Sequence, residues 1–338
     1  MTTVLAFVLV FGLLTIFHEL GHFLMAKKAG ILVEEFGIGF GPKLWGQSWG
    51  ETVYSIRLFP LGGFVKMLGE ETDSKNERSF RSQPPTKRLL VIGAGPVMNF
   101  ILAALLFAFI FFLVGVPVEQ AEIGAVVPES PAYKAGIKPG DVIVAIQGIP
   151  IKAWAEVPAA IATRAGKTTD ITINRSGQIL TVKVMPELAP DGQRGIIGIE
   201  RSMKKHRPLA SLYWGARQMI GTTIFIFQQV VEMVVQRQAT EVAGPLGIVQ
   251  VVSEVAHTGF INLLSLAAVL SVNLGLFNLF PIPMLDGGQI VLITWEAIRG
   301  KGLTPDQEGA INLIGVLLLL ALLALATYQD FKRLGLGV

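Results

Sequence analysis

Four long apolar segments punctuate the 338-residue chain and predict helices that cross a membrane. A helix needs about 20 mostly apolar residues to span the hydrocarbon core of a bilayer. The segments that meet this length are 4–26, 89–116, 260–280 and 308–328. The pattern therefore predicts a polytopic helical membrane protein with about four transmembrane helices.

A fifth segment, 209–236, is also long and apolar, but its polar residues recur at near-helical spacing. These are Arg217, Gln218, Gln228, Gln229, Glu232 and Gln236. Such an amphipathic pattern is typical of a helix that lies at the membrane interface. After a break at 241–247, a second short helix is expected to reach about His257.

Two stretches between the apolar segments predict β-structure. Segment 52–67 is rich in β-branched and aromatic residues around Pro60-Leu61-Gly62-Gly63, which predicts a hairpin with its turn there. Its free edge could pair with an extended peptide, or the hairpin could simply cover the membrane helices. Segment 118–201 has the composition of a small soluble domain, with strands expected at 141–147, 170–174 and 179–184 and a short helix at 154–165.

The soluble segment resembles the PDZ family in two places. The run 130–143, SPAYKAGIKPGDVI, is followed by Gly148, and the later Gly195-Ile196-Ile197-Gly198-Ile199 is similar to the peptide-binding loop and strand of a circularly permuted bacterial PDZ domain. The resemblance implies that backbone amides of this loop capture peptide termini. Steric shielding of the membrane part is the alternative role.

Composition agrees with a membrane protein. Hydrophobic residues make up 51% of the chain, charged residues 16%, and the mean hydropathy is +0.57. The net charge of +3 is thinly scattered, which favours contact with anionic lipid over nucleic acid. With no cysteine in the chain, any metal must be held by nitrogen and oxygen ligands. The first apolar run lacks a basic start and a small-residue cleavage site, so it is expected to be a retained helix rather than a signal peptide.

The first apolar segment contains His18-Glu19-Leu20-Gly21-His22. Residues four apart share one face of a helix, so His18 and His22 can bind one metal ion, and Glu19 can act as a base toward a water beside it. The same pattern occurs by chance on solvated faces of soluble helices. At membrane depth no solvated face exists, and ionisable residues there indicate a functional site.

The third apolar segment ends in Asn278-Leu-Phe-Pro281-Ile-Pro283-Met-Leu-Asp286-Gly-Gly. The two prolines must interrupt the helix, which is tolerated in a membrane only beside protein or a wet cavity. Asp286 is suited to be the third ligand of a catalytic zinc with one open position, although the same set accepts other divalent ions. Asn278 could hydrogen-bond a substrate backbone.

Charge sets the expected topology. Lys27 and Lys28 follow the first segment and no basic residue precedes it, so the N-terminus is expected outside and 27–88 in the cytoplasm. With 209–236 at the interface, the third segment runs inward and brings Asp286 to the same membrane depth as His18 and His22. Both termini and the PDZ domain are then extracytoplasmic, although Lys332 and Arg333 oppose this charge rule.

These motifs together resemble the bacterial site-2 proteases, intramembrane zinc metalloproteases of peptidase family M50 that include the regulator-of-sigma-E proteases. The similarity covers HELGH, GFGP at 39–42, PLGGFVKM, AGPVMNF, the PDZ segment and NLFPIPMLDGG. It implies one zinc held by His18, His22 and Asp286, with Glu19 as catalytic base. Substrate contacts are implied at Asn278, Pro281, Leu61, Gly62 and Gly63. Proteobacterial members have two PDZ domains and only one is found here, so a double-PDZ size filter does not carry over.

The resemblance also implies the biology. Substrates would be single-pass membrane proteins already trimmed outside, such as anti-sigma factors, or remnant signal peptides, cut in the bacterial cytoplasmic membrane. A catalytically silent membrane PDZ receptor and a metal transporter are the rival functions. The expected domains are an N-terminal membrane domain (1–117), a PDZ domain (118–201), interfacial helices (202–258) and a C-terminal membrane domain (259–338).

Overall fold

The computed structural model describes residues 2–70, 74, 76–189, 192–236 and 244–333. The chain forms two compact units, one of residues 1–110 and 212–338 and one of residues 111–211. Each unit is described by itself below.

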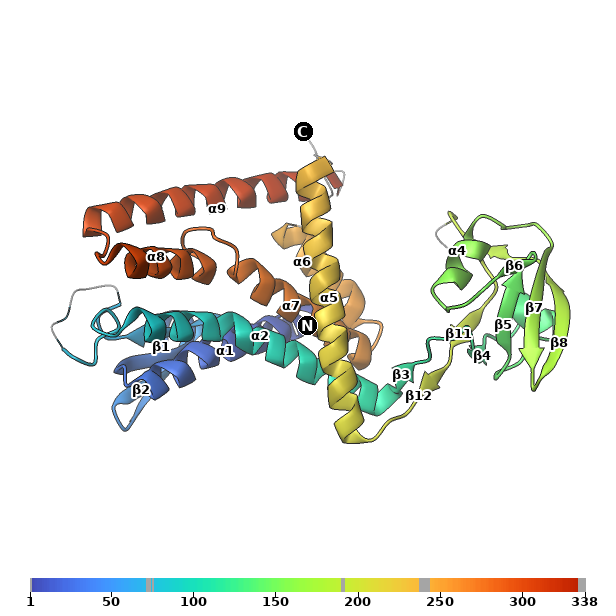
Figure 1. The fold of residues 1–338 in the computed structure, drawn as a ribbon, viewed down its shortest axis with the longest axis horizontal. Helices are drawn as coiled ribbons and strands as arrows, with labels where there is room; N and C mark the ends of the chain where they lie inside the picture. Colours follow the sequence, from blue (N-terminus) through green and yellow to red (C-terminus); the bar gives the residue numbers. More distant parts are fainter. Residues whose placement is uncertain (1, 71–73, 75, 190–191, 237–243, 334–338) are drawn as a thin grey trace. The chain divides into compact units, whose positions relative to one another are not determined.

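Four helices of the described chain are long and apolar enough to cross a membrane, as the sequence predicts. They are α1 (Thr2–Ala29), α2 (Pro85–Val114), α7 (Phe260–Asn278) and α9 (Pro305–Arg333). Three further helices are α5 (Pro208–Gln236), α6 (Pro245–Ala256) and α8 (Asp286–Arg299). In Figure 1, α5 runs across the direction of α2 and α9, and it is not one of the four candidate spans.

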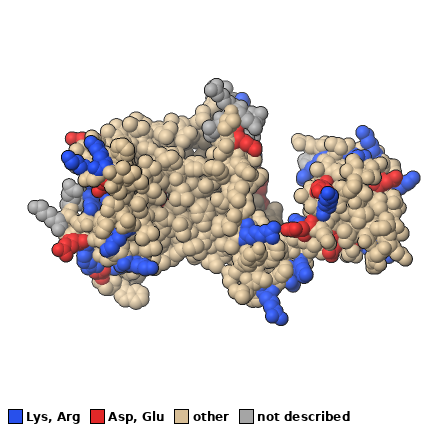
Figure 2. Space-filling model, viewed as in Figure 1, with Lys and Arg blue, Asp and Glu red and all other residues tan. Residues whose placement is uncertain are grey.

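The helical unit packs around two apolar clusters. Val10 and Leu14 of α1 meet Leu102 of α2 and Ala267 of α7 in one of them. Close approach of α1 and α2 depends on Gly21, because a Cβ there would lie 2.3 Å from the Ala94 carbonyl oxygen. Figure 2 shows most charged side chains of this unit near its two ends, with a broad uncharged belt between them on the visible face. Such a belt is the surface that a lipid bilayer covers.

The predicted hairpin at 52–67 is wrong in its pairing. The two halves of strand β2 (Thr52–Met67) do not pair with each other; they lie on opposite sides of residues 35–38 of β1 (Val33–Trp49). Each residue from 35 to 38 pairs with one residue of 53–56 and one of 63–66, while 43–49 pairs with 52–57. Residues 35–38 of β1 supply hydrogen-bond partners to the backbone of both halves of β2. An apolar environment cannot supply such partners. One outer edge of this small sheet is therefore 63–67, and β2 packs against α1.

The second unit holds the elements expected of the PDZ segment. Its main sheet has the order β6-β5-β7-β8, formed by β5 (Val142–Ile146), β6 (Ile149–Pro150), β7 (Thr169–Arg175) and β8 (Gln178–Val184). The predicted helix at 154–165 is α4 (Glu156–Ala162), and α3 (Pro131–Lys134) is capped by the Ser130 hydroxyl. Short strands complete it: β3 (Val116–Pro117), β4 (Ile123–Val126), β9 (Glu187–Leu188), β10 (Gly195–Ile196), β11 (Ile199–Arg201) and β12 (Met203–Lys204).

The core of the second unit is aliphatic and closed. Ile171 and Ile173 alternate along β7, and Ile143 and Ile146 lie on either side of a register shift in β5; all four side chains are at most 1% exposed. Pairs of β-branched residues on facing strands are the usual source of stability in such a sheet. The unit has the strands and the helix expected from the PDZ resemblance, and we refer to it as the PDZ domain.

Candidate metal centre

Three side chains that are far apart in sequence converge inside the helical unit. Both histidines lie on α1, one turn apart, and their Nε2 atoms are 3.1 Å from each other. The Nε2 of His18 lies 3.2 Å from Oδ2 of Asp286, and the Nε2 of His22 lies 3.6 Å from Oδ1 of the same carboxylate. One ligand atom from each residue falls within 4.8 Å of the other two, as a shared metal ion requires.

The break after α7 places Asp286 at the first position of α8. Met284 takes the left-handed conformation (φ 76°), so the chain reverses just before the helix begins. Gly287 and Gly288 follow, and no other residue fits there: a Cβ would lie 2.3 Å from the carbonyl oxygens of Leu279 and Ile282, respectively. Gly287 and Gly288 thus pack tightly against carbonyl groups of the preceding segment. The carboxylate of Asp286 then faces His18 and His22 of α1.

Helix α2 holds the other side of both imidazoles. His22 Nδ1 lies 2.9 Å from the Val91 carbonyl oxygen, and His18 Nδ1 lies 3.1 Å from the Asn99 side-chain amide. Partners of this kind fix the ring orientation and tautomer of a metal-binding histidine. Asn99 is completely buried.

The arrangement fits a metal ion. Oδ2 of Asp286 is buried and has no hydrogen-bond partner among the described residues, although His18 Nε2 is close to it. Two imidazole nitrogens and one carboxylate face each other at 3.1 to 3.6 Å, an arrangement that a cation between them would stabilise. The Gly95 backbone leaves room only for the rings, because a Cβ there would lie 2.3 Å from His22 Nε2.

Glu19 follows His18 on α1 and interacts electrostatically with both His18 and Asp286. Its side chain lies against the outer segment of β2, where a Cβ on Gly63 would come within 3.0 Å of Glu19 Cγ. Gly62 has φ 92° and faces Phe40 instead. The structure therefore brings Glu19 and Gly63 together beside the three ligands, and the side chain of Leu61 lies outside the described residues.

Asn278 is the last residue of α7, eight positions before Asp286. Its side chain is half-buried and makes no hydrogen bond within the described part of the chain. Pro281 is exposed in the break that follows. Both residues belong to the segment that presents the carboxylate.

The PDZ loop predicted from sequence, Gly195–Gly198, packs beside α4. A Cβ on Gly195 would lie 2.8 Å from the Ile161 carbonyl oxygen, so the loop approaches the end of α4 as only glycine allows. Ile197 is buried in the domain core, Ile196 is exposed, and Gly198 is left-handed (φ 74°). The Ile197 and Gly198 amides donate to no backbone acceptor among the described residues.

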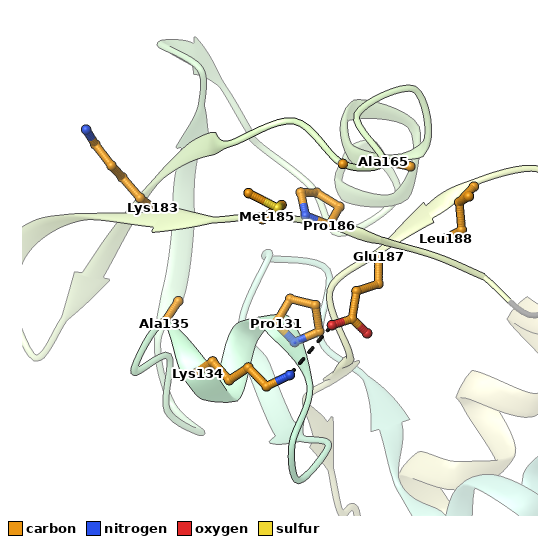
Figure 3. Close-up of a pocket in the computed structure, with 10 residues that line it drawn as sticks. Pro131, Lys134, Ala135, Ala165, Lys183, Met185, Pro186, Glu187 and Leu188 are labelled. Carbon is orange, nitrogen blue, oxygen red and sulfur yellow. Dashed lines mark ion pairs between the residues drawn. The ribbon is translucent and has the colours of Figure 1, made fainter.

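A cavity of about 560 Å³ lies elsewhere in the PDZ domain (Figure 3). Its walls come from α3, the turn after α4, and β8 and β9 with their connection, and Met185 and Pro186 lie opposite Pro131. Lys134 and Glu187 face each other across it at 3.7 Å, and none of the four predicted loop residues lines it.

Sequence reasoning missed Val91, Gly95 and Asn99 as partners of the histidines. It also missed α8, whose signal is weak but present: Asp286 in the first turn, Arg299 in the last, and left-handed Gly300 after it.

Comparison with known proteins agrees with this centre. The family model "Peptidase family M50" matches residues 6–322. The chain is 32% identical to the zinc metalloprotease RasP of Oceanobacillus iheyensis, covering 99% of this chain and 100% of that one. It is 37% identical to a putative zinc metalloprotease of Clostridium acetobutylicum (96% and 95% covered) and 32% identical to the regulator of sigma-W protease RasP of Bacillus subtilis (98% and 99% covered).

Among solved structures, the PDZ domain of an SdrC-like protein from Listeria innocua is 20% identical, with a TM-score of 0.23 over 26% of this chain and all of that one. The family assignment rests on the full-length matches and the family model. The chain belongs to peptidase family M50, and it is a multi-pass membrane zinc metalloprotease.

Proposed function

We propose that this metalloprotease performs site-2 cleavage, cutting single-pass membrane proteins within or beside the bilayer after an earlier cut outside. The convergence of His18, His22 and Asp286 inside the membrane helices, with Glu19 beside them, is the observation that carries this proposal. Anti-sigma factors and remnant signal peptides are the proposed substrates, because they leave a single anchored helix.

In this proposal each side chain of the centre has one role. His18, His22 and Asp286 hold one zinc ion per chain through Nε2, Nε2 and a carboxylate oxygen. When bound, zinc would supply Lewis-acid chemistry that polarises the scissile carbonyl and makes the attacking water more acidic. Glu19 would act as the base toward the attacking water and as the proton donor to the departing amine.

A substrate helix must unwind before cleavage, because its carbonyl groups are already hydrogen-bonded and its peptide bonds are covered. The outer edge of β2, residues 63–67, has a ladder partner on one side only among the described residues. An extended substrate adding to that edge would regain its backbone hydrogen bonds and lie against Glu19. Asn278 would donate to the same substrate backbone, since its side chain is half-buried without a partner in the described chain.

The PDZ domain is proposed to capture a peptide terminus at Gly195–Gly198. Two neighbouring amides without backbone acceptors, those of Ile197 and Gly198, suit a terminal carboxylate. Such a site would favour substrates trimmed outside the membrane, because trimming creates the new terminus. We place the PDZ domain and both chain ends outside the bacterial cytoplasmic membrane, with the metal centre toward the cytoplasmic half.

The test is cleavage of a model single-pass membrane substrate by the purified full chain in detergent, comparing wild type with Glu19→Gln. The variant keeps the size of the side chain and removes the base. We expect cleavage to be lost while the zinc content stays near one per chain. Equal cleavage by both proteins excludes this role of Glu19, and zinc-loaded wild type that cuts no trimmed substrate favours a silent receptor.

A further inference from the structure

Asn99 is a polar side chain in an apolar stretch of α2, and it is completely buried. Its amide nitrogen lies 3.1 Å from His18 Nδ1, while its amide oxygen has no hydrogen-bond partner in the described chain. Its own carbonyl oxygen accepts a hydrogen bond of 2.8 Å from the Ser271 hydroxyl of α7. The backbone at this position is thus fixed independently of the side chain.

The geometry of His18 decides which amide atom it needs. Its Nε2 faces His22 Nε2 and the Asp286 carboxylate, so Nε2 is the atom available to a metal. A neutral imidazole that binds through Nε2 carries its proton on Nδ1 and must donate it. His22 donates in this way to the Val91 carbonyl oxygen, and the side chain of Asn99 is the corresponding group at His18.

The oxygen and nitrogen of an amide have the same shape, so a half turn of the Asn99 amide places its oxygen at 3.1 Å from Nδ1. That turn gives the amide oxygen a donor, while the amide nitrogen takes the position that has no partner among the described residues. It also sets His18 in the tautomer whose Nε2 lone pair points at Asp286 and His22.

We propose that Asn99 is the positioning residue of His18: its amide oxygen accepts the Nδ1 proton and holds Nε2 ready for the metal. The inference rests on the proposed metal centre and adds a residue to it. Packing alone does not explain the choice of asparagine, because an apolar side chain would leave no buried amide unsatisfied.

The test measures the affinity of the full chain in detergent for zinc, by competition with a chromophoric chelator, and the visible spectrum of the cobalt-substituted protein. Asn99→Leu is nearly isosteric and cannot accept a proton, so its zinc affinity should fall by about 10- to 100-fold. Asn99→Asp keeps an acceptor on the same atom and should retain affinity within a few-fold. Ser271→Ala, which loosens the same contact between α2 and α7 without touching His18, is the control and should bind zinc as wild type does.

The outcomes separate two failures. Wild type that binds no zinc or cobalt contradicts the metal centre itself. Wild type that binds, with Asn99→Leu binding equally tightly and giving the same cobalt spectrum, overturns the role of Asn99 alone. If Asn99→Leu does not fold, Asn99→Ala replaces it, and affinity lost in the Ala variant but kept in the Asp variant supports the proposal.

Discussion

Gly95 of α2 lies directly beneath the imidazole of His22: a Cβ added at Gly95 would come within 2.3 Å of Nε2 and 2.5 Å of Cε1 of that ring. The same Cβ would lie 2.8 Å from Cε1 of His18. The imidazole rings of His18 and His22 therefore both pack directly against the backbone of α2 at Gly95. Protein interiors tolerate no such overlap, so one methyl group at Gly95 must displace the rings.

We expect Gly95→Ala to reduce zinc affinity by at least about 100-fold, because it moves two ligands at once. Zinc content after dialysis and cleavage of the model substrate both measure this. Gly93→Ala is the matched control, since it adds the same methyl group two residues earlier on α2, where a Cβ meets nothing within 4 Å. If the Gly95→Ala protein retains as much zinc as the Gly93→Ala protein, α2 must shift to accommodate the methyl group without displacing the imidazole rings.

A second close contact predicts a different phenotype. A Cβ on Gly63 would lie 3.0 Å from Glu19 Cγ and 3.1 Å from the Gly37 carbonyl oxygen. Gly63→Ala should therefore shift Glu19 or the edge of β2 while leaving the three ligands in place. We expect turnover to fall by roughly 10- to 100-fold with zinc content unchanged. Loss of zinc in parallel with activity would instead mean that β2 supports the ligands themselves.

The membrane helices and the three residues of the candidate metal centre could be predicted from sequence because their signals are local. Spanning length is read from one segment, and His18 and His22 share a helix face by their spacing alone. Asp286 could be assigned because two prolines must end a membrane helix at a place that faces protein or water. The PDZ strands alternate strongly enough to be read one by one.

Apart from α8, the misses are relationships between distant segments. Residues 35–38 of β1 pair with both halves of β2. The sequence of β1 is interrupted by glycines and does not predict this pairing. Asn99 and Val91 matter only because α2 lies along α1, and a helix in lipid shows no hydrophobic period that reveals which face meets its neighbour. The sequence therefore does not predict which side chains and carbonyl groups of α2 face the histidines.

Acid should weaken the PDZ domain through Asp141. Burial opposes ionisation of this carboxyl, but hydrogen bonds from Arg175 and from the Lys138 amide outweigh it and hold its pKa below the ordinary 3.8. A depressed carboxyl pKa stabilises the fold fully above that value, and the stabilisation is lost as the pH falls through the lower native pKa. Amide exchange protection of β5 and β7 in the full chain should thus fall below about pH 4.

Asp141→Asn provides the comparison for this acid effect. It removes the titrating group and the charged partner of Arg175, so its protection should be lower at neutral pH and change less between pH 6 and pH 3. If wild type and variant lose protection in parallel on acidification, another group is responsible. Protection factors, which correct for the intrinsic exchange rate, are the quantity to compare.

The ion pair between Arg88 and Glu296 connects α8, which carries Asp286, to α2, whose Val91 and Asn99 contact the histidines of α1. Arg88 of α2 is buried, and its NH2 lies 2.7 Å from Oε1 of Glu296 on α8. Leaving one charge without its partner is the costly change, so Arg88→Glu or Glu296→Arg alone should destabilise the unit by about 2 kcal/mol. The cost is below that of a fully buried pair because Glu296 is partly exposed.

The double exchange, Arg88→Glu with Glu296→Arg, restores opposite charges at the same two positions. If the pair acts by fixing α8, the double variant should recover part of both the melting temperature and the zinc affinity that each single variant loses. Additive losses in the double variant would mean that the two residues act separately. Because neither residue contacts a ligand directly, recovery of zinc affinity reports how firmly α8 presents Asp286 to α1.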